Sequence, residues 1–189
     1  MRRAKSGVRH LKDYQKVILY VYPKIDKIVK DYDGIIKAQA SACFSYESAE
    51  KCAERIAEYI LLKNSFLVLK DGISDILERF TYEELYLLEY KYFRRKKKLE
   101  GEFKDFEFLC NERTYFRKQA RLLEKVNAQL IKEGFDETWF KENFSNCEFM
   151  TYALKKLSQK GCSDMTDKRT VKKLVCRNLR KRVEKSQSV

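Results

Sequence analysis

The sequence predicts an all-α fold, and three observations support that prediction. The chain of 189 residues contains only 6 glycines and a single proline, so few residues interrupt a helix. Apolar residues recur at steps of three and four, and no alternating apolar and polar stretch outlasts this pattern. Hydrophobic residues make up 44% of the chain, which is ample for a buried core. We expect three regions, 1–79, 80–133 and 134–189.

The N-terminal region is expected to form an antiparallel helical pair over residues 10–78. Pro23 either kinks the first helix or opens a second one. Residues 40–47, "ASACFSYE", show no clear period and predict the turn, and a second helix follows over about 48–77. One face of that helix carries Ala49, Ala53, Ile56, Ile60 and Leu67. The buried stripe of the pair is expected to include Ile25, Ile28, Ile56 and Ile60.

The central region begins with a helix-start signal. Thr81 followed by Glu84 in "TYEELYLLEYKYF" matches a capping box, so a helix should begin there. It ends in "RRKKKLEG", whose five adjacent cations must be solvated or neutralised by a partner. A short helix is expected in "EFKDFEFLC", and Asn111 is expected to cap a longer helix from about Glu112. This order of elements is that of a helix-turn-helix unit.

The longer helix has two different faces. Its apolar stripe is predicted to contain Phe116, Ala120, Leu123, Val126 and Leu130. A basic row with a four-residue step lies on a neighbouring face and contains Arg113, Arg117, Arg121 and Lys125. The chain has 41 Lys and Arg against 28 Asp and Glu, a formal charge of +13, which favours an anionic partner such as nucleic acid. In a helix-turn-helix unit, the face opposite the apolar stripe lies in the DNA major groove.

The stretch "LLEYKYF", followed by a turn and "NERTYFRKQARLLEKV", resembles region 4 of the sigma-70 family. It is still more similar to the sigma-like regulators carried by phages and integrated elements of low-GC Gram-positive bacteria. The resemblance covers about residues 80–130 and implies a transcriptional regulator that binds double-stranded DNA at promoters, with RNA polymerase as a further candidate partner. It implies that the DNA contacts are Arg113, Thr114, Tyr115, Arg117, Lys118 and Arg121. Charge alone adds Lys125 and the basic run Arg94, Arg95, Lys96 and Lys97 to this set.

The C-terminal region is expected to be helical as well. Gly134 should end the long helix, and Trp139, Phe140 and Phe144 should form an aromatic cluster that caps the helix-turn-helix core. Ser145 with Glu148 matches a second capping box, which predicts a helix over about 146–160. The tail "TDKRTVKKLVCRNLRKRVEKSQSV" can form one more helix with an apolar face and a strongly basic one. It is either a second DNA contact or a mobile basic tail.

Several classes of protein are disfavoured by what the sequence lacks. No run of about 18 apolar residues exists, and the basic N-terminus has no apolar region after it, so we expect a cytoplasmic protein without a membrane partner. Six cysteines without a C-x-x-C pair, and His10 as the single histidine, predict reduced thiols and no metal site. Without a glycine-rich phosphate loop or another catalytic motif, we expect neither an enzyme nor a cofactor.

Two other functions remain open at the level of sequence. The chain is alternatively a helical protein-interaction module whose basic helices bind an acidic protein, or an RNA-binding protein. The N-terminal helical pair is a candidate interface for a homodimer or for docking of a partner. Tyr82, Tyr86 and Tyr90 are a candidate stacking platform for single-stranded nucleic acid, although their helical spacing favours packing in a core or interface.

Overall fold

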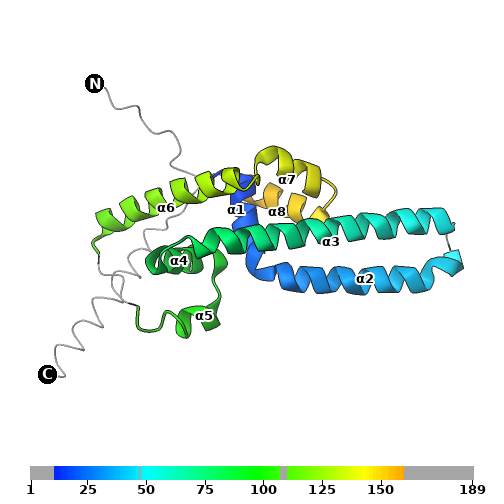
Figure 1. The fold of residues 1–189 in the computed structure, drawn as a ribbon, viewed down its shortest axis with the longest axis horizontal. Coiled ribbons are helices and arrows are strands. Elements are labelled where there is room, and N and C mark those ends of the chain that lie inside the picture. The colour runs from blue at the N-terminus through cyan, green and yellow to red at the C-terminus, as the bar shows by residue number, and fades with distance from the viewer. Residues whose placement is uncertain (1–10, 47, 107–109, 160–189) are drawn as a thin grey trace.

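A computed structural model shows residues 11–46, 48–106 and 110–159, with all their side chains except those of residues 42–46 and 159. Every regular element within these ranges is helical, which confirms the all-α prediction (Figure 1). The elements are α1 (Asp13–Val21), η1 (Tyr22–Lys24), α2 (Ile25–Tyr46), α3 (Ala49–Glu78), α4 (Tyr82–Leu88), η2 (Glu89–Phe93), α5 (Lys96–Glu100), α6 (Glu112–Lys132), α7 (Glu137–Phe144) and α8 (Glu148–Gln159). Of these, η1 is a 3-10 turn and η2 a π-helical turn.

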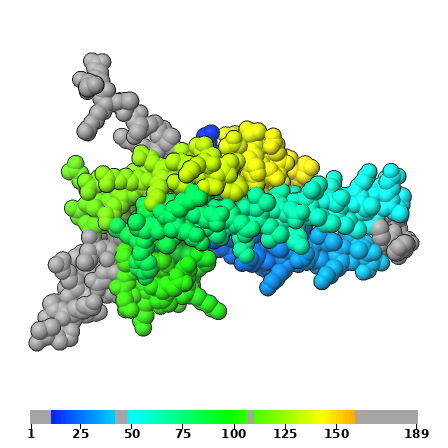
Figure 2. Space-filling view, viewed as in Figure 1, coloured from blue at the N-terminus to red at the C-terminus, as the bar shows by residue number. Residues whose placement is uncertain are grey.

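Helices α2 and α3 form an antiparallel hairpin as expected, but it covers 25–78 and not 10–78, because α1 belongs to the body. The outer part of the hairpin stands clear of the other helices (Figure 2). Ion pairs across the hairpin join Lys63 to Asp33 and Lys70 to Asp26, each at 2.6 Å. The predicted turn at 40–47 was wrong, because α2 continues to Tyr46. That stretch contains no glycine or proline, so nothing in it stops a helix that has α3 as a neighbour.

The buried stripe of the hairpin also differs from the prediction. Ile25 is fully buried, Ile28 and Ile56 are half-buried, and Ile60 is 42% exposed. The outer part of α3 has only α2 beside it, so an apolar residue on its remaining faces meets solvent. The buried residues of α3 are instead Cys52, Phe66, Leu69, Ile73 and Ile76.

Helix α1 is the most buried helix of the described chain. Every residue from Tyr14 to Leu19 is buried, including the polar Gln15 and Lys16. The Gln15 side-chain nitrogen donates to the Asn127 side-chain oxygen of α6 at 2.7 Å, which satisfies its buried amide. Pro23 lies in η1 and separates α1 from α2, so of the two alternatives it opens a second helix rather than kinking a continuous one.

The core is one cluster that α1, α3, α4, α6, α7 and α8 share. The aromatic residues predicted to cluster in the C-terminal region belong to it: the Phe144 ring lies 4.9 Å from that of Phe66, and the Phe140 ring lies 5.7 Å from that of Tyr14. The prediction that Ser145 starts the next helix was wrong. Its backbone is helical and its amide donates to the Lys141 carbonyl, so it ends α7, and α8 starts at Glu148.

Local signals at the ends of the other helices are confirmed. Thr81 and Glu84 form the reciprocal capping box at the start of α4, with the Thr81 amide donating to the Glu84 carboxylate at 2.9 Å. At the end of α6, Gly134 has φ +82°. Its amide and that of Phe135 donate to the carbonyls of Ile131 and Leu130, which is the pattern of a Schellman motif.

The cysteines do not all follow the prediction of reduced thiols. Cys110 and Cys147 are free, but Cys52 is disulfide-bonded, with its partner outside the described side chains. The expectation of six free thiols is therefore wrong for Cys52. Within the described ranges, no helix is both long enough and apolar enough to cross a membrane.

Candidate nucleic-acid interface

Helix α6 lies along the body with its N-terminal half over α4 (Figure 1). Asn111 caps it as predicted, because its side-chain oxygen accepts a hydrogen bond from the Thr114 amide at 2.8 Å. Two ion pairs fasten α6 to the first turn of α4. Lys118 pairs with Glu83, and Lys125 pairs with Glu84 at 2.6 Å.

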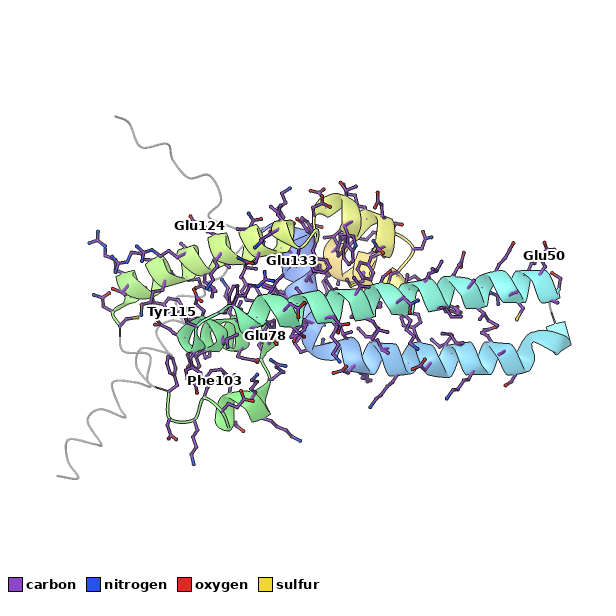
Figure 3. The ribbon with its side chains drawn as sticks, viewed as in Figure 1. Glu50, Glu78, Phe103, Tyr115, Glu124 and Glu133 are labelled. Atoms are coloured by element: carbon purple, nitrogen blue, oxygen red, sulfur yellow. The ribbon has the colours of Figure 1, made fainter. Side chains whose placement is uncertain are left out.

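The buried face of α6 is rotated from the predicted one. At its N-terminal end the buried residues are Tyr115 and Gln119, whereas Phe116 and Ala120 are only half-buried. Figure 3 shows Tyr115 on the side of α6 that faces α4. The rotation could not be read from apolar spacing, because Gln119 is polar and yet 4% exposed. Farther along, the predicted Leu123, Val126 and Leu130 are buried, together with Leu122.

Tyr115 is thus a core residue as well as one of the implied DNA contacts. Its side chain is 3% exposed. Burial raises the pKa of its phenol to about 12, and the nearby Tyr90 and Tyr86 add to the shift. A group so enclosed cannot reach a DNA phosphate or base, and we leave it out of the candidate interface.

Three arginines form the exposed row of α6. Arg113, Arg117 and Arg121 are all exposed, and in the part of the chain that the structure describes none of them pairs with a carboxylate. A four-residue step advances about 6 Å along a helix, so the row is about 12 Å long. Glu124 follows on the same face, on the outer side of α6 in Figure 3, and limits the cationic row to the first three turns. Thr114 lies beside the row and is half-buried.

Lys118 and Lys125 of α6 have a different environment from the arginines. Besides Glu84, the Lys125 ammonium contacts the Arg79 carbonyl at 3.2 Å and lies 4.5 Å from the centre of the Phe80 ring. Burial would raise the pKa of Glu84, but its hydrogen bonds with Lys125 and Thr81 outweigh burial and hold that pKa below its usual value. Lys118 and Lys125 are therefore engaged by the protein itself, and they position α6 on α4.

The basic run after η2 enters a helix where the sequence predicted a connection that is solvated or neutralised by a partner. Helix α5 covers Lys96–Glu100, while residues 101–105, where the short helix was predicted to begin, are turns. The buried Glu89 explains this correction. Its carboxylate accepts a hydrogen bond from the Arg95 side chain at 3.1 Å and lies 4.0 Å from the Lys98 ammonium. Lys98 also pairs with Glu102 at 3.2 Å, so two carboxylates offset two of the five positive charges and weaken the mutual repulsion that opposes a helix.

The remaining cations of the run, Arg94, Lys96 and Lys97, differ in their contacts. Arg94 has a left-handed backbone, with φ 53°, and its side chain donates to the Lys91 carbonyl at 3.2 Å. Lys96 and Lys97 are exposed on α5. Among the predicted contacts in this run, these two are the most available to an anion.

The tyrosines of α4 and η2 pack on the turn that follows α5. The Tyr82 ring lies 4.8 Å from that of Phe103, and the Tyr86 ring lies 4.7 Å from that of Phe106. Phe103 is itself buried. The Tyr82 hydroxyl also donates to the Glu102 carbonyl. These contacts favour the packing alternative, although Tyr82 keeps 51% of its surface exposed.

Comparison of the chain with protein-family models, curated proteins and solved structures finds no match. The resemblance to sigma region 4 therefore depends only on the stretches "LLEYKYF" and "NERTYFRKQARLLEKV".

Proposed function

We propose that this protein binds double-stranded DNA through the N-terminal half of α6. The observation that carries the proposal is the row of Arg113, Arg117 and Arg121, which is exposed and without a carboxylate partner among the described residues. The neighbouring Lys118 and Lys125 pair with Glu83 and Glu84. The fold thus pairs Lys118 and Lys125 with carboxylates and leaves the three arginines of the row to solvent.

The chemistry of an exposed arginine row suits DNA better than other anions. A guanidinium can bind a phosphate or a guanine edge with two parallel hydrogen bonds, and a helix fits the major groove of B-form DNA. Arg113 also lies in the first turn of α6, at the positive end of the helix dipole, where a cation is unfavourable on its own. A bound phosphate would relieve that repulsion. Lys96 and Lys97 of α5 are candidates for further backbone contacts.

The role in transcription depends on the resemblance to sigma-like regulators. In this proposal α4 with η2 is the first helix of a helix-turn-helix unit and α6 is the recognition helix. Arg117 is assigned to base reading because it lies one turn into the helix, and Arg121 to the backbone because it lies farther along. The interface as proposed is smaller than the sequence predicted, because Tyr115 is buried and Lys118 and Lys125 have partners.

The test is the salt dependence of binding. The full chain is titrated with a labelled random duplex at several salt concentrations, and the slope of log affinity against log salt is measured. Each phosphate contact contributes about −0.9 to that slope, so Arg121→Ala should make it shallower by about one. Lys37→Ala is the matched control, because it removes one charge from an exposed position on α2, away from α6. Its slope should equal that of the wild type.

Specificity is tested with a duplex selected by the protein from a random pool. Arg117→Ala should cost roughly 1–3 kcal/mol on the selected site and relax the choice of one base. The proposal fails if Arg113→Ala, Arg117→Ala and Arg121→Ala all bind as the wild type does at every salt concentration. Tighter binding to duplex RNA than to DNA would favour the RNA-binding alternative. Retention of an acidic protein, unaffected by nuclease, would favour the interaction module.

A further inference from the structure

A groove opens where the hairpin leaves the helical body, between α2, α3 and the turn from α7 to α8. Its volume is about 1280 Å³. That exceeds the roughly 300–1,000 Å³ typical of small-molecule pockets, so it is better suited to a polypeptide segment. Four of its apolar lining residues are exposed to solvent, namely Ile35, Leu61, Val68 and Phe149.

The rim of this groove is acidic in a chain that is otherwise strongly basic. It carries Asp31, Glu58, Glu142 and Glu148 against two lysines, Lys24 and Lys27. These four carboxylates are exposed, and none of them forms an ion pair with the described part of the chain. An apolar groove with an acidic rim selects an amphipathic helix with a basic face.

The chain itself contains a segment of that chemistry. Residues 167–182, "DKRTVKKLVCRNLRKR", have eight Lys and Arg against one aspartate. As a helix, this segment would carry Val171, Leu174, Val175 and Leu179 on one face. The segment lies outside the described residues, so its match to the groove is argued from its sequence.

The length of the chain allows the segment to reach the groove. Helix α8 begins at the groove wall with Glu148 and ends at Gln159. At 1.5 Å per residue, α8 carries the chain about 18 Å from that wall. Residues 160–170, when extended, span up to about 36 Å. The connection is therefore long enough for the segment to return to the groove beside the start of α8.

We propose that the groove between α2, α3 and the α7–α8 turn binds residues 167–182 of the same chain. The apolar face of the segment would cover the exposed Leu61 and Phe149, and its cations would meet the acidic rim. Docking would also withdraw the basic face of the segment from any other anion. The proposal does not depend on DNA binding.

The test uses a photoreactive side chain in the full-length protein. Leu61→p-benzoylphenylalanine should keep the fold, because Leu61 is 67% exposed. After irradiation of the purified protein, we expect mass spectrometry of the monomer to find cross-links to peptides from residues 167–182. The same probe at Ile131, which is exposed on α6 and does not line the groove, is the matched control and should give none.

A charge change gives a second readout. Glu58→Lys with Glu142→Lys should lower the yield of this cross-link about fivefold at low salt. The proposal is overturned if the probe at Leu61 cross-links elsewhere in the chain, forms only a dimer, or gives no product. It is also overturned if the two reversals leave the yield unchanged.

Discussion

Two glycines in the α2–α3 hairpin have opposite surroundings. A Cβ added to Gly34, on the outer part of α2, would meet nothing within 4 Å, whereas one added to Gly72 of α3 would lie 2.3 Å from the Phe135 ring. At Gly72, α3 lies so close to Phe135, in the chain after α6, that there is no room for a side chain. The outer hairpin is constrained by one neighbouring helix and by ion pairs, whereas the body is constrained by packing on several sides.

The largest effect should follow truncation of the aromatic centre of the body. Phe144→Ala removes a fully buried ring that packs on Phe66 and Phe140, so it should lower the free energy of unfolding by about 3–5 kcal/mol. Denaturant unfolding monitored by circular dichroism measures this. A loss below about 1 kcal/mol would mean that the core is not packed as described.

Two isoleucines, both predicted to be buried in the hairpin, should now behave differently. Ile25→Ala should cost about 2–5 kcal/mol because Ile25 is fully buried where α2 joins the body. Ile60→Ala, in the outer part of α3, should change stability by no more than about 0.5 kcal/mol. Both values come from the same unfolding experiment. Equal losses for the two variants would contradict the difference between the two regions.

Substituting Gly72 tests the close approach directly. Gly72→Ala should destabilise the protein by about 1–3 kcal/mol, because the added methyl group overlaps the Phe135 ring and forces it to move. In a Phe135→Leu background, Gly72→Ala should cost less stability than it does in the wild type, because leucine lacks the ring. If the two substitutions are simply additive, the ring is not what excludes a side chain at Gly72.

Gly34 should respond in the opposite direction. Gly34→Ala is expected to stabilise the protein by roughly 0.5–1 kcal/mol, because alanine restricts the unfolded chain and nothing in α2 opposes its methyl group. A higher midpoint of thermal unfolding is the measurement. A lower midpoint would show that the outer hairpin contacts something at this position.

The smallest effect concerns pH and the contact between α6 and α4. The pKa of Glu84 is held below its usual value, so its pairing with Lys125 stabilises the fold above the usual glutamate pKa. That contribution is lost as the pH falls through the lowered pKa. The pair is partly exposed, so it should be worth less than about 1 kcal/mol. Accordingly, Glu84→Gln should be less stable than the wild type at pH 7 and closer to it near pH 3.

Signals that act within one turn of the chain could be read from the sequence. The capping box at Thr81, the Asn111 cap and the stop at Gly134 involve residues at most five positions apart, so their chemistry is visible without tertiary structure. The extent of α2 was misjudged because loss of apolar periodicity does not break a helix when glycine and proline are absent. The four-residue step of the arginines predicted their shared face correctly, because that step is a property of the helix.

Features that depend on distant neighbours could not be read in this way. The partners of Lys118 and Lys125 lie 35 and 41 positions away, and only the packing of α6 on α4 reveals them. The capping box predicts where Glu84 lies, in the first turn of α4, but it says nothing of the pairing with Lys125. Glu89 gave no signal of burial, since an isolated glutamate among aromatic residues is equally typical of an exposed face.

The central position of α1 has a consequence for how the chain is made. Gln15 pairs with Asn127, and α1 packs on α8, so contacts of the first described helix span more than a hundred residues. During synthesis α1 is made before the other described helices, but its contacts with α6 and α8 can form only after those two helices have been translated. Until then its apolar surface has few native contacts, and such surface favours aggregation. The hairpin, whose two helices are adjacent in sequence, can form while translation continues.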